Sequence, residues 1–89
     1  MALFFSSRSA NGPSQPVRWH GGEGTFYVHG LFDGGTVTLQ ASFDGGTTWV
    51  GVGPDVTFTV AGAGNFRLGV CLLRAMLAGA TSADVTAGI

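Results

Sequence analysis

The octapeptide Ser42-Phe43-Asp44-Gly45-Gly46-Thr47-Thr48-Trp49 decides the fold class, because it ends an alternating segment at a turn signal. Polar and apolar side chains alternate through residues 36–42, which read TVTLQAS. This period of two indicates a strand with one buried face. Asp44-Gly45 favours a two-residue turn, because glycine reaches positive φ without steric cost and aspartate accepts backbone N–H bonds. The sequence therefore predicts a β-hairpin here.

The same octapeptide matches the pattern S-x-D-x-G-x-T-W, the Asp box found on β-hairpins of sialidases and other β-rich proteins. The match predicts a hairpin and no particular chemistry. The chain departs from sialidases because it has a single copy in one small domain, without multiple blades, an arginine cluster or a nucleophilic tyrosine setting. We therefore expect no sialidase activity.

The turn sequence occurs twice, since Phe32-Asp33-Gly34-Gly35-Thr36 returns eleven residues later as Phe43-Asp44-Gly45-Gly46-Thr47. One strand and one tight turn together take about 8 to 12 residues in a small sandwich or barrel. The spacing predicts a meander with the two turns at opposite ends of one strand. The residues expected to shape these turns, with Trp49 packing beside the second, are Asp33, Gly34, Gly35, Asp44, Gly45, Gly46 and Trp49.

Residues 17–89 carry the remaining β pattern and form the predicted domain. A glycine-rich turn is expected at residues 21–24. A helix over residues 70–78 is the alternative to a strand there, but the segment is short, bounded by glycine and lacks an N-cap. The prediction is an all-β, small antiparallel β-sandwich of about seven short strands, with a small barrel as the alternative. The strands are expected at residues 17–20, 25–32, 36–42, 49–52, 56–60, 66–70, 72–77 and 82–87, with the break between the two that precede the last near Gly69.

Residues 1–16 differ from the rest because serine, asparagine and proline interrupt any period, and we expect an extended N-terminal arm. Its apolar tip, Leu3-Phe4-Phe5, is a candidate contact with a groove on a neighbouring subunit. The alternative is a disordered start, as is common for chain termini.

The composition predicts that much of the surface is buried against other chains. A chain of 89 residues allows one domain with a small core. Only 10% of its residues are charged, against about 25% in typical soluble domains, while 45% are hydrophobic and the mean hydropathy is +0.35. We therefore expect a homo-oligomer or a place in a larger assembly.

Charge and hydropathy argue against nucleic acid and membranes as partners. A net charge of −1, with four arginines and no lysine, argues against nucleic-acid binding, which depends on clustered basic contacts to phosphates. No apolar run reaches the length of a membrane span, and residues 3–5 are too short for the core of a signal peptide. We expect synthesis in the host cytoplasm and no contact with a membrane.

No residue pattern points to catalysis, a cofactor or a metal ion, so we expect no enzyme. His20 and His29 lack a second ligand at metal-binding spacing, and the single Cys71 sits among apolar residues as a small buried hydrophobe. Aspartates recur every eleven residues, but each lies at a turn where its carboxylate is used locally. The one other route to a binding site is stacking on a sugar by Trp19, Tyr27 or Trp49.

Several runs resemble small β-sandwich proteins of tailed bacteriophages, those that decorate the head or build fibres. The resemblance covers about residues 20–87 and rests on residues 24–26, 30–40 and 42–49, on Phe66-Arg67-Leu68, and on Leu73-Arg74-Ala75 with Gly79. It implies a virion structural protein with no catalytic residues.

The sequence-based hypothesis is a head decoration, or cement, protein that stabilises the capsid by bridging its subunits. Its expected partners are copies of itself, with a homotrimer favoured, and the major capsid protein or other virion proteins. The first alternative is a tail or fibre module that acts as an adaptor or contacts a receptor. The second is a carbohydrate-binding module.

Overall fold

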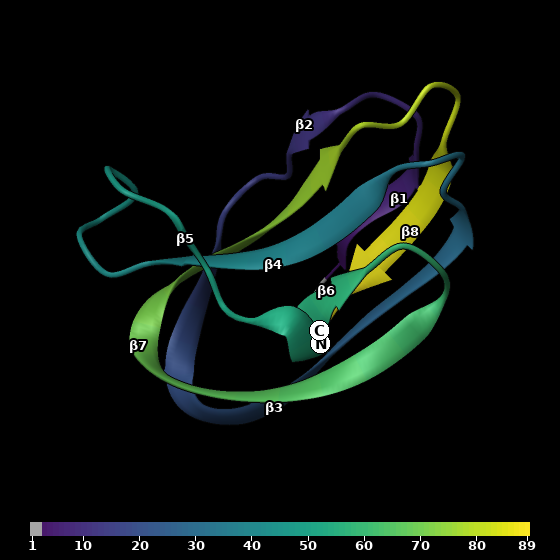
Figure 1. Cartoon of the computed structure of the whole chain (residues 1–89). Coiled ribbons are helices and arrows are strands. Elements are labelled where there is room, and N and C mark those ends of the chain that lie inside the picture. The colour runs from purple at the N-terminus through teal and green to yellow at the C-terminus, as the bar shows by residue number, and fades with distance from the viewer. Residues whose placement is uncertain (1–2) are drawn as a thin grey trace.

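The computed structural model describes residues 3–89, and over these residues the chain is all-β, as predicted (Figure 1). Eight strands form one antiparallel sheet, and a single 3-10 turn, η1 (Pro54–Val56), interrupts them. The strands are β1 (Leu3–Arg8), β2 (Gly12–Pro13), β3 (Val17–Leu31), β4 (Thr36–Ser42), β5 (Val50–Gly51), β6 (Thr57–Phe58), β7 (Gly62–Ala78) and β8 (Asp84–Gly88).

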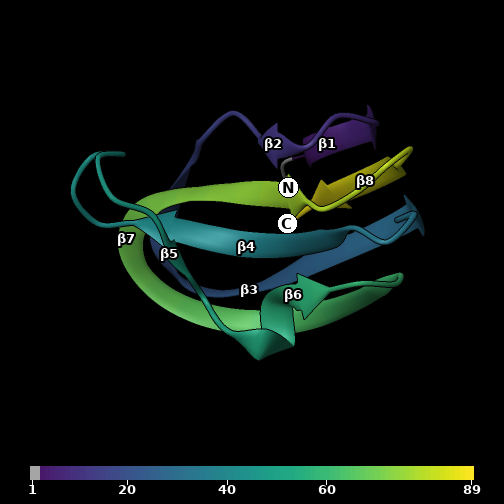
Figure 2. The ribbon, with the colours of Figure 1, turned by 45° about the horizontal axis from the view of Figure 1, so that its top comes forward.

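The sheet folds over itself into a sandwich, because the long strands β3 and β7 pass through both layers (Figure 2). The strand order is β1-β8-β3-β7-β4-β5, with β2 also paired to β7 and β6 to β4. The first layer holds β4, the end of β7 and the start of β3. The second layer holds β1, β8, the end of β3 and the start of β7.

A glycine corner, formed by Gly21, Gly22 and Gly69, takes β3 and β7 from one layer to the other. The ladder runs from His20 opposite Val70 to Gly22 opposite Leu68 and omits only the pair between them. Gly21 and Gly22 have φ values of 94° and 101°, which other residues rarely adopt. Two strands therefore bend together while their backbone pairing continues on both sides of the bend.

Two sequence-based expectations concern this corner. The expected turn at residues 21–24 is wrong, because the chain bends there without reversing direction. The alternative helix over residues 70–78 is also absent, since β7 continues through the segment as a strand. Buried and half-buried side chains alternate from Cys71 to Leu77, which is the period of a strand with one face in the core.

The core lies between the layers and draws on every long strand. Its largest fully buried apolar side chains are Val37 and Leu39 from β4, Leu73 and Leu77 from β7, Phe26 from β3, Val56 from η1 and Val85 from β8. The first predicted turn closes one end of β4. Gly35 N–H donates to the Phe32 carbonyl at 2.8 Å across Asp33 and Gly34, which both have positive φ. The bond and the two positive φ values are those of a tight β-turn. β3 and β4 do not pair with each other, because β7 lies between them in the sheet, so the predicted hairpin and meander are wrong at this turn.

The N-terminal segment lies on the domain itself, so the expectation of a free arm is corrected for residues 3–16. β1 pairs with β8, and β2 pairs with β7. The Phe5 side chain is only 3% exposed, and Phe4 is also buried in the core of the same chain. Of the three residues proposed for a subunit contact, only Leu3 is exposed, at 56%. A domain of this size buries little apolar area, so the burial of these two phenylalanines adds substantially to its core.

We predict that Phe5→Ala lowers the free energy of unfolding by about 3 kcal/mol, because it removes a buried aromatic ring and leaves a cavity. Urea unfolding followed by circular dichroism measures the change. The control, Leu3→Ala on the same strand, should change it by less than about 0.5 kcal/mol, since this side chain is exposed. Equal effects of the two substitutions would contradict the placement of β1.

Candidate functional site

The Asp-box loop, residues 43–49, connects β4 to β5 and is held by the signature residues themselves. The Ser42 hydroxyl donates to Asp44 Oδ1 at 2.8 Å and accepts from Gly46 N–H at 2.8 Å. Asp44 Oδ1 also accepts from Thr48 N–H at 2.9 Å. Trp49 Nε1–H donates to the Gly46 carbonyl at 3.1 Å. Side chains thus replace the ladder bonds that a short hairpin would make.

The expectation of a second two-residue turn is therefore wrong in length, because β4 ends at Ser42 and β5 begins only at Val50. The two similar pentapeptides differ in what precedes them. Ser42 precedes the second pentapeptide and supplies a hydroxyl to its turn, whereas Leu31, which has no hydroxyl, precedes the first. The aspartates lie at opposite ends of β4, as predicted, so Asp33 and Asp44 do not form one site.

Hydrogen bonds lower the pKa of Asp44 below the usual aspartate value. The largest cause is the bond from Thr48 N–H, followed by the bond from the Ser42 hydroxyl. Both bonds favour the ionised carboxylate, so this group stays charged at neutral pH. The loop is thereby fixed in one conformation at the end of β4.

We predict that acid releases the Asp-box loop. The pKa of Asp44 is lower in the folded state than in the unfolded state. Its contribution to the stability of the folded loop is therefore complete above the unfolded-state pKa and is lost as pH falls through the folded-state pKa. Hydrogen exchange at the Thr48 amide should therefore accelerate on acidification beyond the intrinsic pH dependence of exchange. The Asp44→Asn variant should lack this pH-dependent step, and the control Asp84→Asn should keep it. A step that persists in Asp44→Asn would contradict the assignment.

An arginine covers the tryptophan of the loop. The Arg74 guanidinium carbon lies 4.3 Å from the centroid of the Trp49 ring, and Arg74 Nε donates to Gln40 Oε1 at 2.7 Å. This cation–π contact and hydrogen bond fasten the loop to the outer side of β4 and β7. One face of the Trp49 ring is therefore covered by Arg74 and is not open to a ligand.

Trp19 is also withdrawn from the surface, because it is buried beside Phe66 with ring centroids 5.0 Å apart. Its indole N–H is buried and has no hydrogen-bond partner in residues 3–89. Of the three aromatics considered for a sugar site, only Tyr27 lies on an outer face without such a cover, where its ring stacks with that of His29.

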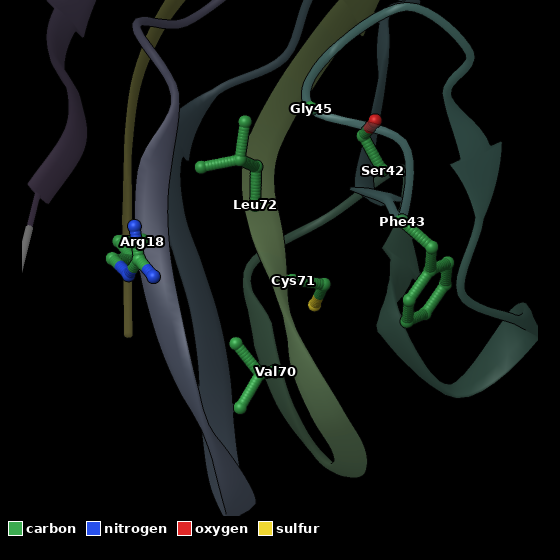
Figure 3. A pocket seen from close by; sticks show the side chains of 7 residues that line it. All are labelled: Arg18, Ser42, Phe43, Gly45, Val70, Cys71 and Leu72. Atoms are coloured by element: carbon green, nitrogen blue, oxygen red, sulfur yellow. The ribbon is translucent and has the colours of Figure 1, made fainter.

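Exposed apolar side chains gather around the Asp-box loop. We call Phe43, Val50 and Val70 the Phe43 rim. Phe43 is 61% exposed and Val70 is 63% exposed. Phe43 lines two open depressions, of about 150 Å³ with Arg18, Val70 and Leu72, and of about 200 Å³ with Val50 and Asp44. In Figure 3, Val70 and Leu72 lie on one side of β7, while Cys71 and Phe43 lie on the other.

The rim combines apolar area with an available cation. The Arg18 guanidinium lines the first depression and makes no hydrogen bond within residues 3–89, whereas the Arg8 and Arg74 side chains make such bonds. Cys71 lines the same depression, but burial raises the pKa of its thiol, so it remains protonated at neutral pH. The arrangement suits contact with another macromolecule more than nucleophilic chemistry.

Among residues 3–89, no three side chains of the histidine, cysteine, aspartate or glutamate types lie close enough to hold a metal ion. His20 and His29 lie on the surface, beside Trp19 and Tyr27 respectively. Within the same residues, no helix is long and apolar enough to cross a membrane.

No protein-family model matches this chain, and no curated protein sequence or solved structure matches it either.

Sequence reasoning missed Phe43 as the centre of the site, although a signal was present. The inward positions of β4 are Val37, Leu39 and Ala41, and Phe43 continues this phase by one step. The strand has ended by then, so the phenylalanine extends beyond the core instead of entering it. An apolar residue in phase with a strand but past its end therefore indicates a contact surface.

Proposed function

We propose that this chain is a structural subunit of a bacteriophage particle, namely a head decoration protein that bridges subunits of the major capsid protein. The observation that supports this most is the Phe43 rim, where Phe43 is exposed on a loop held by its own hydrogen bonds, and Val50 of β5 and Val70 of β7 are exposed beside the depressions that it lines. An exposed apolar patch on a chain with so few charges fits a surface that is covered in the assembled state.

The rigidity of the loop supports a binding role for the rim. Binding costs conformational entropy whenever a loop must become ordered, and a preformed loop avoids much of that cost. Ser42 and Asp44 hold the backbone on both sides of Gly45, and Phe43 lies between them. The phenylalanine is therefore presented in a defined place, as expected for an anchor residue that enters a pocket on a partner.

The composition supports self-association as well as attachment. The chain has nine charged residues in 89, and a closed homotrimer would suit the local symmetry of a capsid. Burying one valine or phenylalanine side chain contributes about 1.5 to 3 kcal/mol. Covering the exposed parts of the three side chains of the Phe43 rim in each subunit would contribute favourably to a contact across a seam between capsid subunits. Such binding raises capsid stability by mass action.

The experiment for this proposal is quantitative mass spectrometry of purified virions from the phage that encodes the chain. We expect a copy number in proportion to that of the major capsid protein. A few copies per particle would instead support the tail or fibre alternative, which uses the same apolar surface at a single position. Virions without the chain would contradict both.

We predict that Val70→Ser weakens oligomerisation or particle binding by about tenfold, because it removes apolar area from the contact. The matched control is Val60→Ser, which changes the same side chain at a similarly exposed position (68%) outside the rim. Val60→Ser should leave the affinity unchanged. Sedimentation velocity and binding to particles that lack the chain provide the measurements, and equal affinities for both variants would contradict the role of the rim.

A further inference from the structure

A second surface, on the opposite side of the second layer from the core, differs from the Phe43 rim. We call it the β3 outer face. Along the end of β3, Phe26 and Val28 point into the core, so the intervening side chains point outward. Residues directly opposite on neighbouring strands share that face. The face comprises Glu23, Thr25, Tyr27 and His29 of β3, Asn65 and Arg67 of β7, and Thr86 of β8.

The aromatic part of this face is a parallel pair. The rings of Tyr27 and His29 are 6.3 Å apart and inclined by only 7°. Tyr27 lies opposite Ala63 on one neighbouring strand and opposite Gly88 on the other. Because these two neighbours are small, the residues directly opposite do not cover the phenol ring, and Tyr27 is half-buried. The aromatic pair therefore forms a ridge that a ligand can reach.

The polar part continues along the same strands. Thr25 Oγ1–H donates to Asn65 Oδ1 at 2.8 Å, which orients the amide and leaves its N–H groups without a partner in residues 3–89. Glu23 and Arg67 are directly opposite each other, and neither side chain has a hydrogen bond within the described part of the chain. Glu23, Gly24, Thr25 and Asn65 line an open depression of about 280 Å³.

We propose that the β3 outer face binds a neutral oligosaccharide. A sugar ring presents an apolar C–H surface, which packs on aromatic rings, and hydroxyl groups that both donate and accept. Here Tyr27 and His29 supply the rings, Glu23 supplies an acceptor, and the Asn65 amide and Arg67 supply donors. The site lies away from the Phe43 rim, so the proposal is independent of the assembly role.

The charges favour a neutral ligand. Glu23 and Arg67 have opposite signs at adjacent positions, so neither a polyanion nor an acidic peptide meets a consistently complementary field. Tyr27 is four positions after Glu23, which is roughly 13 Å along a strand. This distance exceeds one sugar ring, so the site accommodates an oligosaccharide with one unit against the rings and another in the polar depression.

The first layer offers no such surface. On its outer side Arg74 is bonded to Gln40 and covers Trp49, so these three side chains are already partnered, while Arg18 lines the depression of the Phe43 rim. On the β3 outer face, the Glu23 carboxylate, the Arg67 guanidinium and the Asn65 N–H groups have no hydrogen-bond partner within residues 3–89. This contrast between the layers distinguishes the β3 outer face from an ordinary solvated sheet surface.

An NMR titration of the ¹⁵N-labelled full chain tests the proposal. The probes are neutral oligosaccharides of glucose, galactose, mannose and N-acetylglucosamine, with sialylated counterparts as charged comparisons. We expect at least one neutral probe to shift the amide signals of residues 23–29 and 63–67. Tyr27→Ala and Glu23→Gln should each weaken its affinity by about tenfold or more, while circular dichroism and thermal unfolding verify that both variants remain folded.

Val70→Ser is the matched control for this site, because it alters the Phe43 rim and should leave sugar binding unchanged. The proposal is overturned if no neutral probe binds at millimolar concentration, if the shifts cluster elsewhere, if the sialylated probes bind more tightly, or if both β3 variants keep full affinity. None of these results alters the copy number in virions, so failure here is distinguishable from failure of the proposed assembly role.

Discussion

The glycine corner is the constraint on which the rest of the structure depends. β3 and β7 remain paired on both sides of it, so the two layers of the sandwich are parts of one continuous sheet. Gly21 and Gly22 supply positive φ values at the bend, and no side chain there obstructs the change of direction. Once the two strands are bent together, β4 can pair only in the first layer and β8 only in the second. The core is the space that this bend encloses.

The sequence predicted the parts of this fold that depend on local pattern. Alternation over residues 36–42 and the Asp33-Gly34 turn signal indicated a strand and its closing turn correctly. The glycine cluster at residues 21–24 was misread because glycines serve a reversal and a corner equally well. The burial of Phe5 depends on a tertiary neighbour, β8, that is distant in the sequence. The length of the Asp-box loop depends on the Ser42 hydroxyl, whose partners are visible only in three dimensions.

The candidate site was less predictable than the fold. The three aromatic residues proposed for stacking on a sugar lie in different environments. Trp19 is buried and Trp49 is covered by Arg74, so of the three only Tyr27 lies on an outer face without such a cover. Composition predicted that other chains cover apolar surface, but it did not indicate where. The structure places exposed apolar area around Phe43 and unpartnered polar groups around Glu23. The proposed attachment and the proposed ligand recognition therefore use different surfaces of one small domain.

We propose that the chain works as a subunit whose Phe43 rim is buried in an assembly. A cryo-electron microscopy map of the intact particle, at a resolution that shows side chains, tests this most directly. We expect density for this domain at regular positions on the head, with Phe43 and Val70 enclosed by a neighbouring subunit. A domain that is bound to the particle with both side chains facing solvent, or a complete map with no density for this domain, would contradict it.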